Sequence, residues 1–331
     1  MGKFLESEKG QQAKFKASSP TFSEAASADG LYKTKFRPFC LPREHSAENL
    51  FPGIRQNALD YFAAYQIKWH DAIQGNPSNH LCDSQVCCVN FLFPFADQPC
   101  ALADMLRPHF PTLHTMLPIE NGQYVAFEWI GQENYLGEKI SRNGKRTRGA
   151  NCTSADAAVM FQHTNGQRQI VLIEWKYTES YSPSSLKLAK SGTDRTHIYV
   201  HLFERDDCPI NKALLPHFDD LFYEPFYQLM RQQFLAQEME RARELGADVV
   251  SVLHIAPAHN TDFHKVTSAN LKTLGKTAMD VWRNLARPRS RFLSLSTEQL
   301  FGPLSAEQLP EMQDWLEYIG LRYIWVHKTW H

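Results

Sequence analysis

Three residues near the middle of the chain have side chains that could together hydrolyse a phosphodiester bond: Asp156, Glu174 and Lys176. That reaction needs acidic oxygen ligands for a divalent cation, a group that positions or activates the attacking water, and positive charge near the transition state. Two carboxylates and one ammonium can supply all three. Because Glu174 and Lys176 are two residues apart, a strand would point them to the same face. The chemistry then depends on whether Asp156 reaches that face.

The acids are connected by a predicted hairpin. Apolar residues alternate over 157–161, as in a half-buried strand. The apolar run 170–173 is typical of a strand covered on both faces, and it would anchor Glu174 and Lys176 at the end of that strand.

The length of the loop in this hairpin determines where Asp156 lies. A two-residue turn at 165–166 would pair Asp156 with Trp175 and leave it on the opposite face from Glu174. A three-residue loop at 164–166, with its glycine in the left-handed conformation, pairs Asp156 directly with Glu174. We predict the three-residue loop, because the other register leaves no shared site for an ion.

The remaining pattern predicts strands and helices that interleave, and therefore an α/β fold around a mixed sheet. The expected helices cover 57–70, 101–106, 226–245, 278–285 and most of 306–326. The expected strands cover 89–93 within an apolar run at 86–95, then 124–130, 196–203 as a strand or extended segment, 249–255 and 291–295. Residues 1–48 show no sustained period and are expected to be a poorly ordered arm, followed by a single domain over 49–331 with helical additions at both ends.

Asp156 followed by Glu174, Trp175 and Lys176 resembles the catalytic signature of the PD-(D/E)XK nuclease superfamily, although Ala155 stands where the motif has proline. Segments 148–151, 153–156 and 174–181 resemble a bacterial group of restriction-endonuclease-like proteins. The resemblance implies an αβββαβ core with a mixed central sheet flanked by helices. It also implies two acidic ligands for Mg²⁺, with Mn²⁺ as a substitute, and a lysine that orients or deprotonates the water.

These roles would fall to Asp156, Glu174 and Lys176. The resemblance further implies an upstream acid, for which Glu138 and Glu128 are candidates, and a polar residue on the helix after the second strand. Gln228 fits that last position best. Gln232, one turn later, is the alternative. Either residue could instead be an ordinary glutamine on the solvent-facing side of the helix, with no role in the site.

A basic segment precedes the first acid: residues 139–148 hold five basic residues and no acidic one. It is either a solvated loop or a surface that holds DNA phosphates beside the acids, and we favour the second reading. The residues to which we assign DNA contacts are Lys145, Arg146, Arg148, Asn151, Ser154 and Tyr177.

The composition and the absence of other motifs limit which classes of protein and which compartments we expect. The formal net charge is -1 and the pI about 6.9, so attraction to nucleic acid must come from local patches. We expect no membrane span and no secretory signal, and seven cysteines without an export signal predict reduced thiols in the cytoplasm. P-loop, G-x-S-x-G and H-E-x-x-H fingerprints are absent from the sequence.

We therefore expect a Mg²⁺-dependent nuclease that hydrolyses DNA by metal-activated water, as a restriction-like endonuclease, with a homodimer for cleavage of both strands. The alternative is a non-catalytic DNA-binding relative of the same fold in a defence or mobile-element system. A third reading is an interaction protein whose helical C-terminus contacts a partner. DNA binding without metal-dependent turnover would distinguish the second hypothesis from the first.

Overall fold

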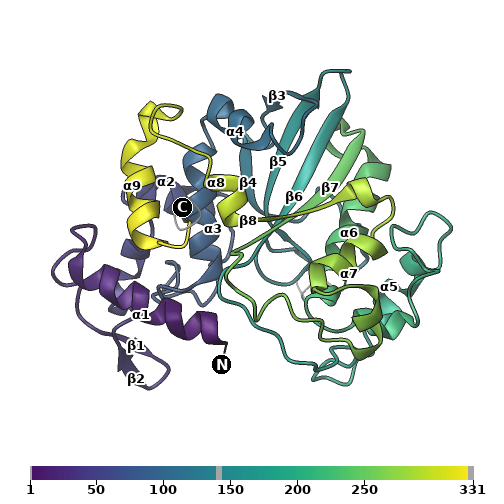
Figure 1. The fold of residues 1–331 in the computed structure, drawn as a ribbon, viewed down its shortest axis with the longest axis horizontal. Coiled ribbons are helices and arrows are strands. Elements are labelled where there is room, and N and C mark those ends of the chain that lie inside the picture. The colour runs from purple at the N-terminus through teal and green to yellow at the C-terminus, as the bar shows by residue number, and fades with distance from the viewer. Residues whose placement is uncertain (1, 139–143, 327–331) are drawn as a thin grey trace.

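A six-stranded mixed sheet forms the centre of the computed structural model, which describes residues 2–138 and 144–326, and helices cover both faces of the sheet (Figure 1). The strands are β3 (Leu113–Leu117), β4 (Val125–Trp129), β5 (Ala155–His163), β6 (Arg168–Trp175), β7 (Val249–Ala256) and β8 (Phe292–Ser296). Both β3 and β4 pair antiparallel with β5, which pairs antiparallel with β6. From β6 onward the order β6-β7-β8 is parallel. The predicted α/β class with a mixed sheet is confirmed.

The two faces of the sheet bury different sets of helices because successive side chains of a strand point to opposite sides. On β5, Val159 and Phe161 belong to one core, and Ala158 and Met160 belong to the other. The first core is covered by α1 (Lys3–Ser18), α2 (Arg55–Ala64), α3 (Ser84–Leu92), α4 (Pro99–Leu106), α8 (Thr297–Phe301) and α9 (Gln313–Arg322). The second is covered by α5 (Thr196–Phe203), α6 (Phe226–Ala242) and α7 (Ala278–Leu285).

Short elements complete the chain. A separate two-stranded sheet consists of β1 (Gly30–Tyr32) and β2 (Lys35–Arg37). The 3-10 turns are η1 (Arg43–Asn49), η2 (Phe93–Phe95), η3 (Phe218–Leu221), η4 (Glu244–Gly246), η5 (Ala269–Leu274), η6 (Arg289–Arg291) and η7 (Pro310–Met312). Across the described residues, no single helix is long and apolar enough to cross a bilayer. Among these residues, only a bent pair, formed by α3 and η2 together with α4, would have the required length and composition.

The hairpin between β5 and β6 has the predicted three-residue loop. Ala157 pairs with Ile173, and the ladder ends where the amide of His163 donates to the carbonyl of Gln167 at 2.8 Å. The loop glycine, Gly166, has a φ of 87°, as this turn requires. Continued by one step, the register sets residue 156 opposite residue 174, so both acids lie on the face that α6 covers.

Most expected elements are present, but two segments predicted as strands are helices. Residues 89–93 belong to α3 and η2, and residues 196–203 form α5. Residues 86–92 of α3 are all buried and show no visible period, so helix and strand look alike in this sequence. The side chain of Asp83, which accepts from the amide of Val86 at 2.9 Å, is the helix N-cap that marked the true start of α3. Strand β3 was not predicted.

The N-terminal segment also differs from the expected poorly ordered arm. Helix α1 buries Glu8, Gln12, Phe15 and Lys16, and the ring of Phe15 packs edge-on against that of Tyr318 in α9. The buried positions follow a helical spacing, but three of the four carry polar side chains, so a search for apolar periodicity misses the stripe. Figure 1 shows α1 lying beside the C-terminal part of the chain.

Candidate active site

Asp156, Glu174 and Lys176 meet at the ends of β5 and β6. The Lys176 ammonium lies 3.8 Å from Asp156 Oδ2 and makes a closer ion pair with Glu174 Oε1. Asp156 Oδ2 also accepts from the amide of Trp175 at 2.7 Å, and the amide of Lys176 donates to the carbonyl of Ile255 in β7 at 2.8 Å. The neighbouring strands thus hold the ammonium between two carboxylates.

A pocket of about 340 Å³ opens onto this cluster. Asp156 and Lys176 line it, whereas Glu174 lies deeper, with 1% of its surface exposed. Other residues around the pocket are Gln85, Glu128, Ser154, Gln228, Arg231 and Gln232. The pocket is large enough for part of a ligand to reach the acids from one side.

Burial sets the protonation of the cluster. It raises the pKa of Glu174 to about 8, with the charge of Asp156 adding to the effect and that of Lys176 opposing it. Burial also raises the pKa of Asp156 above its ordinary value. Burial alone would lower the pKa of Lys176, but the charges of Glu174 and Asp156 outweigh it and raise that pKa well above the ordinary value. The ammonium therefore stays charged, and burial favours the protonated form of each acid.

Gln232, rather than Gln228, is the helix glutamine that contacts the acids. Its side-chain amide donates to Glu174 Oε2 at 2.9 Å and to the carbonyl of Ser154 at 2.5 Å. Gln228 lines the same pocket one turn earlier in α6. The two glutamines lie one turn apart on the same face of α6, so the helical pattern predicts their face but not which of them reaches the acids.

Glu128 is the further acid that shares the pocket. It is 7% exposed, and its carboxylate accepts from the Ser154 hydroxyl and from the Gln85 side-chain amide, both at 2.6 Å. Burial and the charge of Asp156 raise its pKa to about 7. With a φ of 49° it is left-handed inside a strand, which is uncommon outside glycine and clusters at functional sites.

Glu138, the other candidate for this role, is engaged elsewhere. Its carboxylate accepts from the amide of Thr153 at 2.6 Å and from the hydroxyl of Tyr199 at 2.7 Å. It lies 3.5 Å from the guanidinium of Arg231 and does not line the pocket. Glu138 therefore ties the segment before β5 to α5 and α6.

A family model described as Restriction Endonuclease associating with ARP matches residues 7–324. The chain belongs to this family. The match begins within α1 and ends just beyond α9, so the terminal helical layers are part of the family as well as the central sheet. No curated protein and no solved structure gives a significant match. Membership of a restriction-endonuclease family suggests nuclease activity and DNA as the substrate.

The basic segment of this endonuclease-family chain is engaged internally where the structure describes it. Arg146 donates to four carbonyls of the neighbouring turn, at 130–133. Arg148 donates to the carbonyls of Phe127 and Glu128 and pairs with Glu120 at 2.7 Å. Both guanidinium groups therefore support β4 and its turn, which makes them poorer candidates for holding phosphates than the sequence suggested.

The other assigned DNA contacts vary in their access to solvent. Tyr177 is fully buried, and its hydroxyl donates to Glu8 at 2.6 Å, so its side chain is not exposed for contact with DNA. Asn151 bonds the amide of Thr147 and the carbonyl of Lys145 within its own loop. The ammonium of Lys145 donates to Gln66 at 2.5 Å on the surface, and Ser154 is the partner of Glu128 described above. The basic residues Lys139 and Arg142 lie outside the described residues.

The donor set suits a hard cation that needs few protein ligands. Among the described residues, no three His, Cys, Asp or Glu side chains converge as a ready-made metal site. Mg²⁺ does not need one, because it commonly keeps several waters and binds through one or two carboxylates and substrate phosphates. Glu174 Oε1 is buried, faces the Lys176 ammonium and accepts no well-aligned hydrogen bond from the described residues. Asp156 and Glu174 thus fit Mg²⁺ or Mn²⁺.

Proposed function

We propose that the chain is a PD-(D/E)XK-type, Mg²⁺-dependent deoxyribonuclease that hydrolyses DNA phosphodiester bonds. The observation that carries the proposal is the Lys176 ammonium held between the carboxylates of Asp156 and Glu174 at the edge of a pocket. A structural ion pair on a strand end has no need of a second buried acid, and burying two carboxyl groups and an amine together costs free energy that function can explain.

Each residue of the cluster has a role in this proposal. Asp156 and Glu174 would hold the ion, which when bound polarises the phosphate and lowers the pKa of water. Lys176 places positive charge beside the attacked phosphate and orients the water. Gln232 fixes the carboxylate of Glu174 through its 2.9 Å hydrogen bond. Glu128 is our candidate for a further acid near the ion, in place of Glu138.

Cleavage of plasmid and linear DNA with Mg²⁺, and with a chelator instead, tests the proposal. We expect wild type to cut only with the metal, and Asp156→Asn and Lys176→Ala to lower the rate by about a hundredfold or more. Lys187→Ala is the matched control, because that lysine pairs with Asp219 on the surface. Cleavage by Lys176→Ala at the wild-type rate would contradict the catalytic assignment.

The non-catalytic alternative makes a different prediction for the same protein. It expects salt-dependent DNA binding and no turnover with any divalent metal. The intact set of two acids and a lysine favours the enzyme. Cleavage of both strands would bring two active sites together, and we propose a homodimer on DNA, which sedimentation of the complex can detect.

The family description also names an association with ARP. We infer that this chain acts together with an ARP component. Measuring DNA cleavage with and without ARP from the same source tests this inference. A cleavage rate or a site preference that changes when ARP is added supports it. Unchanged cleavage, with no co-migration of the two proteins, contradicts it.

A further inference from the structure

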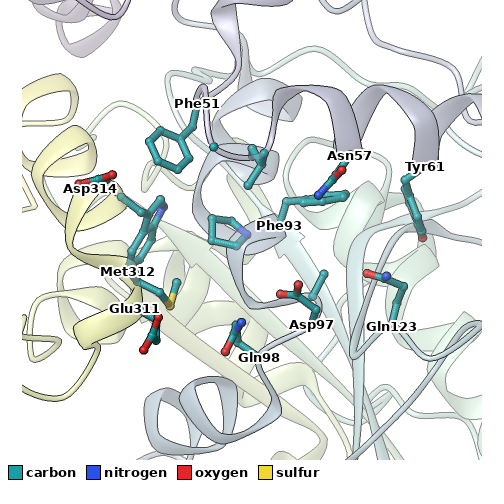
Figure 2. A pocket seen from close by; sticks show the side chains of 15 residues that line it. Phe51, Asn57, Tyr61, Phe93, Asp97, Gln98, Gln123, Glu311, Met312 and Asp314 are labelled. Atoms are coloured by element: carbon teal, nitrogen blue, oxygen red, sulfur yellow. The ribbon is translucent and has the colours of Figure 1, made fainter.

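A second pocket, of about 350 Å³, lies between α2, η2 and the C-terminal segment that begins with η7 (Figure 2). Its apolar lining includes the rings of Phe51, Phe93 and Trp315 together with Ile54 and Met312. A concave apolar lining with a few polar groups at the rim is the usual construction of a binding site. The volume is enough for one long side chain.

The rim of this pocket carries unbalanced negative charge. Asp97, Glu311 and Asp314 line it and are all exposed, and no lysine, arginine or histidine does. In the part of the chain that the structure describes, none of the three carboxylates has an ion-pair partner. Figure 2 shows Asp314 and Glu311 on the left of the view and Asp97 to their right, with Phe51 and Phe93 nearer the top. A cation that enters would therefore meet carboxylates from more than one direction.

We propose that this pocket binds an arginine side chain of a partner protein. A guanidinium is planar and weakly hydrated, so it stacks on aromatic rings while its N–H groups donate to carboxylates. The side-chain amides of Asn57, Gln98 and Gln123 at the rim offer further acceptors for its five donors. A lysine ammonium is more strongly hydrated and lacks the flat face.

Free arginine carries an α-ammonium as well as an α-carboxylate, so the rim acids alone do not separate it from an arginine within a polypeptide. Titration with free arginine beside the peptide distinguishes the two sources. Tighter binding of the peptide supports the proposal, and equal or tighter binding of the free amino acid contradicts a ligand carried by a partner protein.

Calorimetric titration of the full chain at low ionic strength with a capped Gly-Arg-Gly peptide tests the proposal. Matched peptides replace the arginine with citrulline, which is neutral and nearly isosteric, or with lysine. We expect saturable binding of the arginine peptide and at least about tenfold weaker binding of the other two, equivalent to about 1.4 kcal/mol. Absence of saturable binding, or equal binding of the citrulline or lysine peptide, would overturn the proposal.

Variants locate the binding in this pocket. Asp97→Asn with Asp314→Asn keeps the shape of the rim and removes two charges, and we expect it to weaken the arginine peptide by about tenfold or more. Glu317→Gln is the matched control, because Glu317 is exposed on the same helix as Asp314 and does not line the pocket. Equal binding by the double variant and by the control would place the peptide elsewhere and refute the site.

Discussion

Lys176 occupies the place between two carboxylates that a divalent ion would take. Its ammonium contacts both acids, and its raised pKa keeps it charged. In the protein without metal, the Lys176 ammonium therefore balances the negative charge of the acids that Mg²⁺ would balance when bound. If Asp156 and Glu174 hold the ion as we propose, the ammonium would have to leave its place between them.

The contact between Gln232 and Glu174 predicts unequal effects for two neighbouring glutamines. Gln232→Ala frees the carboxylate of Glu174 and leaves it without a neutral donor, so we expect at least about a tenfold loss of cleavage rate. Gln228→Ala removes a side chain that only lines the pocket and should cost less than threefold, since no contact with the acids is lost. Single-turnover rates of both variants, with circular dichroism to check folding, decide this; a larger loss from Gln228→Ala would reverse the assignment.

The pKa shifts predict how pH affects the metal-free protein. The pKa of Glu174 rises from 4.5 to about 8, so the folded state binds more protons than the unfolded state in that range. Stability from this group is present below about pH 4.5 and is lost as the pH rises toward 8. Mg²⁺ must displace the proton, so it should raise the melting temperature more at about pH 8.5 than at about pH 6. Thermal melts with and without Mg²⁺ measure this difference.

Glu174→Gln provides the control for the pH experiment. The variant cannot ionise at this position, so we expect Mg²⁺ to shift its melting temperature little at either pH. A wild-type shift that is independent of pH, or one that Glu174→Gln retains, would show that the ion binds away from Glu174.

At the scale of elements, the loop of the β5–β6 hairpin positions the acids. A Cβ at Gly166 would meet no other atom within 4 Å, so Gly166→Ala probes only the left-handed backbone, and we expect it to lower the free energy of unfolding by about 1 kcal/mol. Gly10 in α1 has the same free space but helical backbone, so Gly10→Ala should stabilise by up to about 1 kcal/mol. Urea unfolding of both variants measures the opposite signs, and equal signs would contradict the backbone assignment.

Local patterns were enough to predict the elements that carry the acids. The spacing of Glu174 and Lys176 predicted that the two side chains share one face of a strand. The choice of loop length predicted that Asp156 lies opposite Glu174. The first argument uses only the strand period, whereas the loop length was chosen because only that register brings Asp156 to the face of Glu174. They did not require knowledge of the rest of the molecule.

Local patterns could not predict the contacts that other elements make with the site. Gln85 reaches Glu128 from α3, a helix that was predicted as a strand because its apolar run hides the period. The left-handed backbone of Glu128 and the internal bonds of Arg148 depend on the packing around β4, which has no local signature. Residue type alone made Arg148 look like a phosphate ligand.

At the scale of the whole molecule, Arg322 joins segments from opposite ends of the chain. It is fully buried in α9 and donates to Gln12 in α1, to Asn49 and to the carbonyl of Leu81. Rings of Tyr318 and Tyr323 lie 5.8 and 5.1 Å from its guanidinium. A buried polar network of this kind links distant segments, so the sequence of any one of them gives no sign of it.

We expect Arg322→Leu to lower the free energy of unfolding by at least about 3 kcal/mol, because several buried acceptors lose their donor at once. Arg322→Lys keeps the charge but not the fork of donors, and should fall between wild type and Arg322→Leu. Equilibrium unfolding in urea measures both. A loss of less than about 1 kcal/mol in Arg322→Leu would show that the network contributes little to stability.

The most direct test of the central claim is a crystal structure of the protein soaked with Mn²⁺, with data collected to locate the metal by its anomalous signal. We expect one ion about 2 Å from an oxygen of Asp156 and an oxygen of Glu174, with the Lys176 ammonium moved from between the two carboxylates. An ion bound away from these acids, or no ion with Lys176 still paired to both, would contradict it.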